Sequence, residues 1–423
     1  MLKESALYIC YFGLREPLVQ TQVLPYIRQL RDAGVKMSIL TFEPERANAP
    51  GAGEIELFKK SLADEGIEWH FLKYHKTPSV PATIFDILNG ARFIRKFIGT
   101  SNPDILHCRV HTPALMAAIA KRLTRKPTKL LFDIRGFFPE EYTDAGRWKE
   151  NGLLYKAVKR IEKWLLKESD GFVVLTEKAR EILFPESKGT GFDKRGRPVE
   201  VIPCCVDLER FKDANEESRK RFREEFELGD RKVIAYVGSF GGWYLTQETA
   251  DFFAVAKRED QDVFALILTQ SDPNEIELLL KERGFGAGDF LVAKVKPDEI
   301  PYYLSGSDMA LSFIKPCYSK QASSPTKNAE YLACGLPIVV NDGVGDTARM
   351  TIDDDVGVVI DSFTNEAYAD ALKKIEEMSQ DQAALSARCR KSAEKRFDLN
   401  SVGGFRYKNL YERLLDNDYF PKG

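Results

Sequence analysis

Residues 323–340 read SSPTKNAEYLACGLPIVV, and this stretch specifies the fold class more sharply than any other part of the chain. A small polar turn leads into a helical pattern, Gly335 stops the helix, and Pro337 precedes an apolar run suited to a strand. The free N–H groups and the positive dipole end of such a helix attract an anion, and Lys327 adds a full charge. Glu330 lies three residues further along the helix. The stretch predicts a βαβ unit with an anion-binding turn, although an ordinary capped helix has the same pattern.

Strand and helix patterns alternate on both sides of this stretch. Apolar runs alternate with longer amphipathic stretches, which is typical of parallel sheets in α/β proteins. The series restarts after the charged segment 207–229, and 423 residues exceed one typical core. We therefore predict two Rossmann-like domains, at 1–206 and 207–400. The expected strands lie at 6–11, 36–41, 105–108, 129–132, 171–175, 199–203, 232–237, 263–269, 290–295, 309–314, 337–341 and 357–360.

Composition excludes several classes of protein. The formal net charge is -2, which provides no basic face for nucleic acid. The first residues lack the apolar core of a secretory signal, and every apolar run is far shorter than a membrane-spanning helix. Seven cysteines without a C-x-x-C motif fit reduced thiols. We therefore expect a cytoplasmic protein.

Polar side chains follow three of the expected strands in the first domain. The carboxyl ends of parallel strands meet at one edge of a sheet, where ligands bind in open α/β folds. No G-x-G-x-x-G pattern is present, so a dinucleotide cofactor is not expected. The candidates at this edge are Gly13, Arg15, His107, Arg109, His111, Asp133, Arg135 and Glu140.

The segment 132–142 is the densest of these groups of polar residues. The Arg135 guanidinium suits a phosphate or carboxylate, and the Asp133 carboxylate suits sugar hydroxyls. A surface ion pair between the two is the alternative. His107 and His111 are four residues apart, which is weak support for a metal site.

A second glycine-rich turn lies in the second domain, where residues 233–242 read VIAYVGSFGG. Together with 323–340, this turn resembles the donor-binding segments of family 4 of the retaining glycosyltransferases, which have the two-domain B-type fold. Weaker similarity covers most of the chain, including VIPCCVDLERF at 201–211. The resemblance implies two Rossmann-like domains whose parallel sheets face each other across a cleft. It also implies that a closing helix at 401–423 crosses back to the first domain.

The resemblance implies a metal-independent enzyme that moves a sugar from a nucleoside-diphosphate sugar to a hydroxyl acceptor, as in polysaccharide biosynthesis. The acceptor is left open among glycans, lipid-linked acceptors and small molecules. The implied catalytic residues are Asp133, Arg135 and Lys327. The implied donor-binding residues are Gly13, Gly238, Ser239, Phe240, Lys296, Ser323, Ser324, Pro325, Thr326, Lys327 and Glu330. The implied acceptor-binding residues are Arg15, His107, Arg109, His111 and Glu140.

The chain departs from the family pattern at three positions. Ala322 stands where the first of two glutamates is usual, Ser239 follows Gly238 in place of a basic pair, and Asp133 replaces a histidine. These departures keep two alternatives open. One is a noncatalytic nucleotide-binding subunit of a transferase complex, and the other is a sugar-nucleotide epimerase on the same fold.

Two further segments invite other interpretations. The run 353–355 imitates the D-x-D metal motif of single-domain transferases, but it lies outside the expected site. The basic helix expected at 156–167 is a candidate for peripheral membrane contact, although interspersed glutamates favour a solvated face.

Overall fold

The computed structural model describes residues 4–44, 52–124 and 126–416. The chain divides into two compact units. The first unit comprises Met1–Pro203 and Leu399–Gly423, and the second comprises Cys204–Asp398. The division at 203/204 and 398/399 lies within three residues of the boundaries expected at 206/207 and 400/401.

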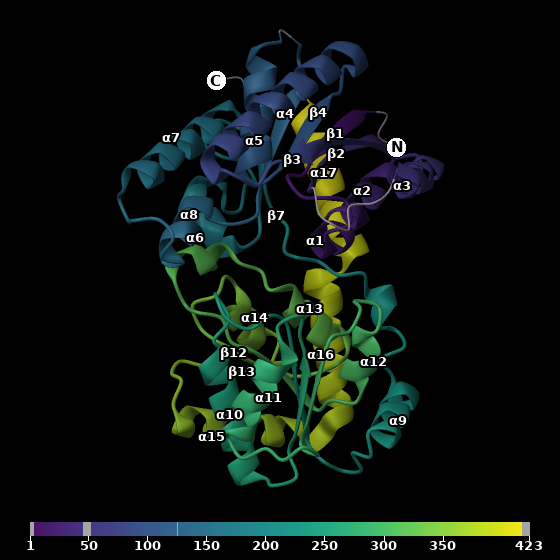
Figure 1. Ribbon diagram of the computed structural model, residues 1–423, viewed down its shortest axis with the longest axis vertical. Coiled ribbons are helices and arrows are strands. Elements are labelled where there is room, and N and C mark those ends of the chain that lie inside the picture. The colour runs from purple at the N-terminus through teal and green to yellow at the C-terminus, as the bar shows by residue number, and fades with distance from the viewer. Residues whose placement is uncertain (1–3, 45–51, 125, 417–423) are drawn as a thin grey trace. The chain divides into compact units, whose positions relative to one another are not determined.

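The first unit contains a seven-stranded parallel sheet (Figure 1). Its order, β3-β2-β1-β4-β5-β6-β7, reverses direction between β1 and β4, as in Rossmann-like folds. Ile9 at the end of β1 stands opposite Leu40 of β2 and Cys108 of β4. The strands are β1 (Ser5–Ile9), β2 (Lys36–Pro44), β3 (Glu68–Tyr74), β4 (Ile105–Arg109), β5 (Lys129–Ile134), β6 (Gly171–Val174) and β7 (Val199–Val201).

One strand of this unit, β3, was not expected from the sequence. β3 is an edge strand that pairs only with β2, and most of its side chains are half-buried or exposed. Such a strand needs no continuous apolar run, so its sequence EWHFLKY carries a weak strand signal.

The helices of the first unit, apart from the last helix of the chain, are α1 (Pro17–Gln22), α2 (Leu24–Asp32), α3 (Ala52–Asp64), α4 (Ser79–Ser101), α5 (His111–Arg122), α6 (Phe138–Asp144), α7 (Leu153–Glu168) and α8 (Glu177–Leu183).

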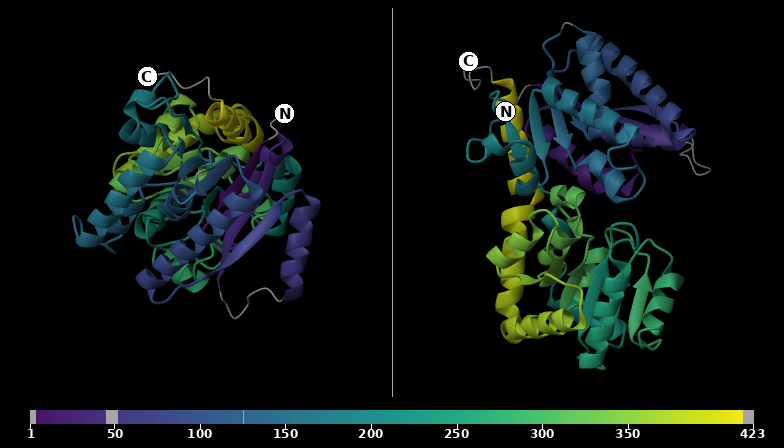
Figure 2. Two further views of the ribbon diagram at one scale, coloured as in Figure 1. Left: turned by 90° about the horizontal axis from the view of Figure 1, so that it is seen from above. Right: turned by 90° about the vertical axis from the view of Figure 1, so that its left-hand side faces the viewer.

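The last helix of the chain, α17 (Phe405–Leu415), belongs to the first unit, where Figure 2 shows it in yellow beside the strands. It follows a short π-helical segment at Leu399–Gly404. Its buried side chains include Tyr407 and Tyr411, whose hydroxyls reach the ends of β5 and β4. A segment far along the chain therefore completes the core of the first sheet.

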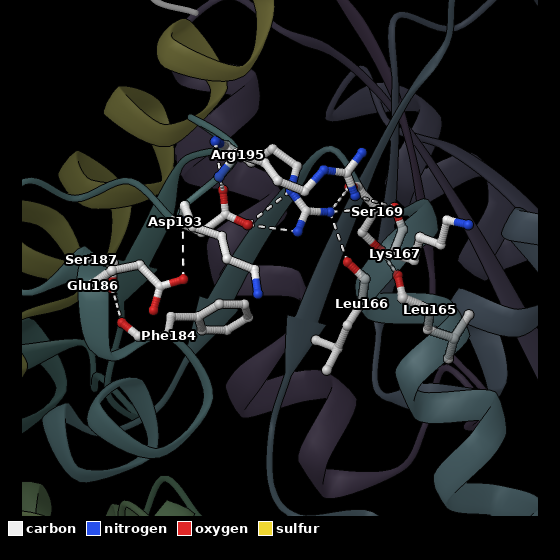
Figure 3. Close-up of polar contacts among 11 residues, drawn as sticks. Leu165, Leu166, Lys167, Ser169, Phe184, Glu186, Ser187, Asp193 and Arg195 are labelled. Carbon is white, nitrogen blue, oxygen red and sulfur yellow. Dashed lines mark hydrogen bonds and ion pairs between the residues drawn. The ribbon is translucent and has the colours of Figure 1, made fainter. Parts of the chain in front are cut away.

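Arg197 holds the connection from β6 to β7 in place. Figure 3 labels its partners Asp193, Leu166 and Ser169. Its guanidinium donates to the carbonyl oxygens of Leu166 and Ser169, both at 2.7 Å, and to the Asp193 carboxylate at 2.6 and 2.9 Å. The last carbonyl groups of a helix have no hydrogen-bond donor within the helix, and at the end of α7 the guanidinium of Arg197 is that donor. The contact joins the end of α7 to the loop that precedes β7.

The second unit has a six-stranded parallel sheet in the order β10-β9-β8-β11-β12-β13. Its strands are β8 (Val233–Val237), β9 (Phe264–Leu268), β10 (Phe290–Ala293), β11 (Met309–Ser312), β12 (Ile338–Asn341) and β13 (Gly357–Ile360). Its helices are α9 (Glu216–Glu225), α10 (Thr246–Glu259), α11 (Pro273–Lys281), α12 (Ile300–Ser305), α13 (Thr326–Ala333), α14 (Thr347–Asp353), α15 (Asn365–Met378) and α16 (Gln382–Phe397).

Helices cover both faces of this sheet, which therefore has two cores. Val233, Ala235 and Val237 of β8 point into one core, and Ile234 and Tyr236 point into the other. The strand is buried on both faces, which explains its continuous apolar sequence. Two Rossmann-like units with parallel sheets confirm the predicted α/β fold class.

Candidate active site

The second sheet reverses its strand order between β8 and β11, and Gly238 directly follows β8 at that point. Gly238 has a φ of 142°, a region that favours glycine. A Cβ on this residue would lie 2.8 Å from Nζ of Lys327. A side chain at position 238 would therefore displace the lysine ammonium from the end of the strand, which is the place where ligands bind in such folds.

Lys327, in the first turn of α13, is 7% exposed. Its ammonium lies 4.2 Å from the ring centre of Tyr236 and 4.4 Å from that of Tyr244. Within the described part of the chain, Nζ has no hydrogen-bond partner. Burial lowers the pKa of Lys327 to about 7, against the opposing charge of Glu330. An anion beside Nζ would supply the missing partner and restore the full charge.

Glu330 lies one turn further along α13 and is half-buried. Burial raises the pKa of its carboxyl to about 7, although Arg210 and Lys327 oppose the shift. A carboxyl group with this pKa suits hydrogen bonds to ligand hydroxyls at neutral pH. Lys327 and Glu330 therefore place a cation and a hydroxyl-binding group on one helix.

The start of α13 is open to a ligand. Pro325 precedes the helix, and no side chain caps it. Ser324 turns its hydroxyl toward the backbone N–H of Cys204, from which it accepts a hydrogen bond at 3.2 Å. Uncapped N–H groups at a helix start favour an anion. The predicted anion-binding turn thus lies directly beside the ammonium of Lys327.

The turn after β8 contains two aromatic residues that the sequence analysis missed. Trp243 lies under the ammonium of Lys320, with 4.1 Å between Nζ and the ring centre, and Tyr244 lies under that of Lys327. The expected basic pair is absent from this turn, but two lysines from the segment 318–327 face it instead. A run of aromatics after a glycine-rich turn is the signal that indicates such cation contacts.

Three other predicted donor residues have modest roles here. The Ser239 carbonyl accepts a hydrogen bond from the Tyr236 hydroxyl at 2.8 Å. The ring of Phe240 packs on that of Tyr236, with centres 4.6 Å apart. Lys296 is exposed after β10, and its backbone N–H donates to Glu299 at 2.7 Å. These contacts shape the turn and the loop without showing a ligand contact.

In the first unit, Asp133 lies at the centre of a buried polar cluster. Its carboxylate accepts a hydrogen bond from Tyr407 at 3.0 Å, and Nε2 of His107 lies 3.6 Å away. Arg135 and Arg109 approach the carboxylate to 3.6 and 3.9 Å. Burial favours the neutral acid, but Arg135, His107 and Arg109 outweigh it and lower the pKa of Asp133 to about 2. The carboxylate is thus an ion held by internal partners.

His107 is equally enclosed. Nδ1 lies 3.0 Å from the Tyr411 hydroxyl, and the ring packs against Tyr8 and Tyr407. Burial lowers its pKa. Asp133 and His107 are each 0% exposed, so their contact with a sugar stays a prediction that burial does not favour. Through Tyr407 and Tyr411 they hold α17 against β4 and β5.

Three more predicted acceptor residues are also occupied by internal contacts. Arg109 donates to the carbonyl of Gln22 at 3.2 Å. Nε2 of His111 lies 3.1 Å from Glu162, and Glu140 accepts from Tyr155 at 3.0 Å. All three side chains are buried. Acceptor binding by Arg109, His111 and Glu140 therefore stays a prediction, and each of these side chains already has an internal partner in the structure. The side chain of Arg135 is 5% exposed, and its catalytic role also stays a prediction.

The turn after β1 faces a carboxylate that the sequence analysis overlooked. A Cβ on Gly13 would lie 2.9 Å from Glu43, which also accepts a hydrogen bond from the Leu14 backbone at 2.8 Å. Arg15 is exposed and pairs with Glu54 at 3.1 Å. Glu43 ends β2 beside β1, which explains how it reaches this turn.

A second overlooked group lies at the same edge of the first sheet. His75 follows β3, and its Nδ1 lies 2.5 Å from the buried carboxylate of Asp86 on α4. Asp86 also accepts hydrogen bonds from Tyr11 at 2.7 Å and from the His75 backbone at 3.0 Å. When Nδ1 donates to Asp86, Nε2 carries the lone pair of a neutral imidazole. The side chain of His75 is about one-third exposed, so part of the imidazole is open to solvent.

The D-x-D imitation at 353–355 has structural partners. Asp354 pairs with Arg396 and Lys395 and accepts from Ser392 at 2.7 Å, and Asp355 pairs with Arg388. In the described ranges, no three His, Cys, Asp or Glu side chains are grouped so as to hold a metal ion. No helix within those ranges is long and apolar enough to span a bilayer.

Comparisons of the sequence with known families agree with this geometry. The model of Glycosyltransferase Family 4 matches residues 19–210, and the model of Glycosyl transferases group 1 matches residues 218–396. The two matches correspond closely to the two units. The chain therefore belongs to the glycosyltransferases, with a family 4 first domain and a group 1 second domain.

One curated relative and several solved structures are similar to this chain. EpsD of Bacillus subtilis (strain 168), a protein named as a candidate glycosyltransferase, is 31% identical over 144 residues, which cover 33% of this chain and 35% of EpsD. The match thus spans about a third of that relative. A glycosyltransferase from Rickettsia africae ESF-5 has a TM-score of 0.72 at 17% identity, covering 98% and 99% of the two chains.

Two further solved structures extend this comparison. Sucrose-phosphate synthase from Thermosynechococcus elongatus has a TM-score of 0.71 at 16% identity, covering 97% of this chain and 99% of that one. Anabaena Alr3699/HepE in complex with UDP and glucose has a TM-score of 0.66 at 15% identity, covering 97% and 100%. At these identities the likeness shows the shared B-type fold.

Proposed function

We propose that the chain transfers a sugar from a nucleoside-diphosphate sugar to a hydroxyl acceptor with retention of configuration and without a metal. The observation that carries the proposal is the Lys327 ammonium, buried at the end of β8 without a hydrogen-bond partner in the described ranges. A buried cation without a partner is costly to the fold. A diphosphate at the start of α13 would provide that partner, so diphosphate binding would explain why the cation is buried there.

The same residues suit the chemistry of the transfer. The bond between the anomeric carbon and the diphosphate oxygen breaks, and the electron pair stays with the diphosphate. The acceptor oxygen bonds to the anomeric carbon, and its proton passes to the departing phosphate. Lys327 and the α13 N–H groups stabilise the negative charge that develops on the leaving group, which is the part a metal ion plays in other enzymes.

Glu330 provides the second donor contact in this proposal. Its carboxyl lies one turn beyond Lys327, where it suits the ribose hydroxyls of the same nucleotide. Uridine diphosphate is the first nucleotide to test, because the solved Anabaena neighbour has been crystallised with UDP and with UDP-glucose. The proposed donor is therefore a UDP-sugar.

On the acceptor side, the proposal assigns hydroxyl binding to His75. The buried Asp86 carboxylate orients the imidazole through Nδ1, so that Nε2 accepts a hydrogen bond from the acceptor hydroxyl. The group stands at the carboxyl edge of the first sheet, where ligands bind in α/β folds. It replaces the buried histidines as the candidate acceptor contact.

A panel of UDP, GDP, ADP, dTDP and CDP, with and without divalent metal, tests donor binding by thermal shift. A ligand at a hundred times its Kd adds about 2.7 kcal/mol to the free energy of unfolding, which moves the midpoint measurably. We expect UDP to stabilise the protein equally with and without metal. Stabilisation only in the presence of metal contradicts metal independence, and no stabilisation by any nucleotide contradicts the proposal.

A noncatalytic subunit is the second candidate, and one observation favours it. Ala322, which stands where the family has a glutamate, is buried and apolar. Incubation of purified protein with UDP-glucose and a mixture of sugar acceptors separates the candidates by product analysis. Transfer or donor hydrolysis excludes the noncatalytic role, and a changed donor without acceptor indicates an epimerase.

A further inference from the structure

Helix α4 (Ser79–Ser101) exposes a row of large apolar side chains. Val80, Ile84, Phe85 and Leu88 are 52%, 53%, 55% and 59% exposed. The spacing of four residues from Val80 to Ile84 to Leu88 places these three on one face of the helix. Exposed apolar residues grouped in this way mark an interaction surface more often than scattered ones do.

The same face continues as a basic surface. Four residues beyond Leu88 stands Arg92, and Arg95 and Lys96 follow one turn later, all three exposed. The single acidic residue of α4, Asp86, is buried and bonded to Tyr11 and His75. The exposed face is therefore apolar in its first half and positive in its second half, and it carries no negative charge.

We propose that this face of α4 binds the surface of an anionic lipid bilayer. The apolar half would enter the boundary between headgroups and acyl chains, and Arg92, Arg95 and Lys96 would bind lipid phosphates. The proposal concerns a surface of the first unit and does not depend on the proposed reaction. It moves the predicted membrane contact from the helix at 156–167 to α4.

The charge pattern favours lipid over a second copy of the chain. Two α4 helices packed antiparallel would set the basic half of each against the apolar half of the other. Two parallel helices would align like charges, and neither arrangement supplies an acidic partner. A bilayer with anionic headgroups offers an apolar boundary to the first half of the face and phosphate groups to the second half.

Helix α7, which the sequence made the first candidate, lacks this arrangement. Its exposed large apolar residues are Leu153 and Leu154, both in the first turn. The remaining exposed face is mainly basic, with Lys156, Arg160 and Lys163. α7 can add electrostatic attraction to an anionic surface, but it offers no apolar row to insert.

Flotation of the full chain with extruded vesicles tests the proposal. One set contains phosphatidylcholine alone, and the other is an equimolar mixture with phosphatidylglycerol. We expect the protein to float with the mixed vesicles at low salt, and far less with phosphatidylcholine or at high salt. The double variant Ile84→Ser and Leu88→Ser should lower the partition coefficient about tenfold or more.

Leu278 on α11 provides the matched control, because it is also a leucine 59% exposed on a helix, but in the second unit. Leu278→Ser should float like the wild type, and circular dichroism should show that all variants melt alike. Equal flotation with both vesicle types, no flotation, or equal loss in Leu278→Ser overturns the proposal. A dimer in light scattering that Leu88→Ser dissociates, with no vesicle binding, also overturns it in favour of a second copy.

Discussion

Nζ of Lys327 lies 2.8 Å from the point where a Cβ on Gly238 would stand. The position of the Lys327 ammonium therefore depends on the absence of a side chain at position 238, in the turn after β8. A side chain at position 238 would push the lysine ammonium away from its present place. The positive φ of Gly238 adds a second reason for glycine at this point.

The substitution Gly238→Ala should weaken nucleotide binding by displacing the Lys327 ammonium. We expect the affinity for UDP to fall about tenfold or more, since a hydrogen bond to a charged group contributes about 1.5–3 kcal/mol. The free energy of unfolding should also fall by about 1–3 kcal/mol because of the backbone strain. Isothermal titration and chemical denaturation measure the two effects.

Gly242→Ala separates the strain from the steric clash. Gly242 also has a positive φ, of 62°, but no atom lies within 4 Å of its Cβ position. This variant should lose stability while it keeps its affinity for UDP. If both variants lose affinity equally, the contact with Lys327 is not the reason for the glycine.

The buried charges of α13 should impose a pH dependence on stability. The pKa of Lys327 falls from 10.5 to about 7, so the unfolded chain holds the extra proton between these values and the free energy of unfolding rises with pH there. The pKa of Glu330 rises from 4.5 to about 7, so the folded chain holds the extra proton and the free energy of unfolding falls across that window.

Two variants isolate these slopes, each of which amounts to at most about 1.4 kcal/mol per pH unit. Lys327→Met should flatten the rise above pH 7, and Glu330→Gln should flatten the fall below it. Urea denaturation at a series of pH values measures both. Unchanged slopes would show that the two groups titrate as they do in the unfolded chain.

Asp133→Asn tests the assignment of this residue to the core. Removing the charge leaves Arg135, Arg109 and His107 without their common anion, which should cost about 3–5 kcal/mol of stability. In the wild type this contribution is present above pH 3.8 and is lost as the pH falls toward 2. The affinity for UDP should not change. If the variant is as stable as the wild type but has lost affinity for the acceptor, Asp133 contacts the sugar directly and is not mainly a core residue.

His75 offers a test of the acceptor side. His75→Asn keeps a hydrogen-bond donor near the Nδ1 position, next to Asp86, and removes Nε2, whereas His75→Gln places a polar group near Nε2. Once product analysis identifies an acceptor, the Asn variant should raise its KM about tenfold and leave the KM of the donor unchanged. The Gln variant should recover part of the loss. Equal acceptor KM in all three proteins would remove His75 from the site.

The arrangement of the proposed donor residues on α13 was predictable from the sequence because these residues are close in the chain. The turn at 323–325, Lys327 and Glu330 lie within eight residues, and local helix geometry fixes their relation. The role of Gly238 was also predictable as a turn. Its contact with Lys327 was not, because a sheet and its helices bring together residues 89 positions apart.

The burial of the predicted acceptor residues could not be read from the sequence, for a physical reason. A carboxylate at a strand end looks the same in sequence whether it faces solvent or lies under a helix. Asp133 is covered by Tyr407, which lies 274 residues away in the sequence, and His107 by Tyr411, 304 residues away. The His75–Asp86 pair was missed because β3, which positions His75, has too weak a pattern to be recognised.

The most direct test of the central claim is the affinity of the wild type and of Lys327→Met for UDP, measured by isothermal titration at pH 6.5 without metal. We expect the wild type to bind UDP and the variant to bind it about 10- to 100-fold more weakly, because the variant has lost a charge-assisted hydrogen bond. Equal affinities in the two proteins would contradict the assignment of the buried ammonium to the donor diphosphate.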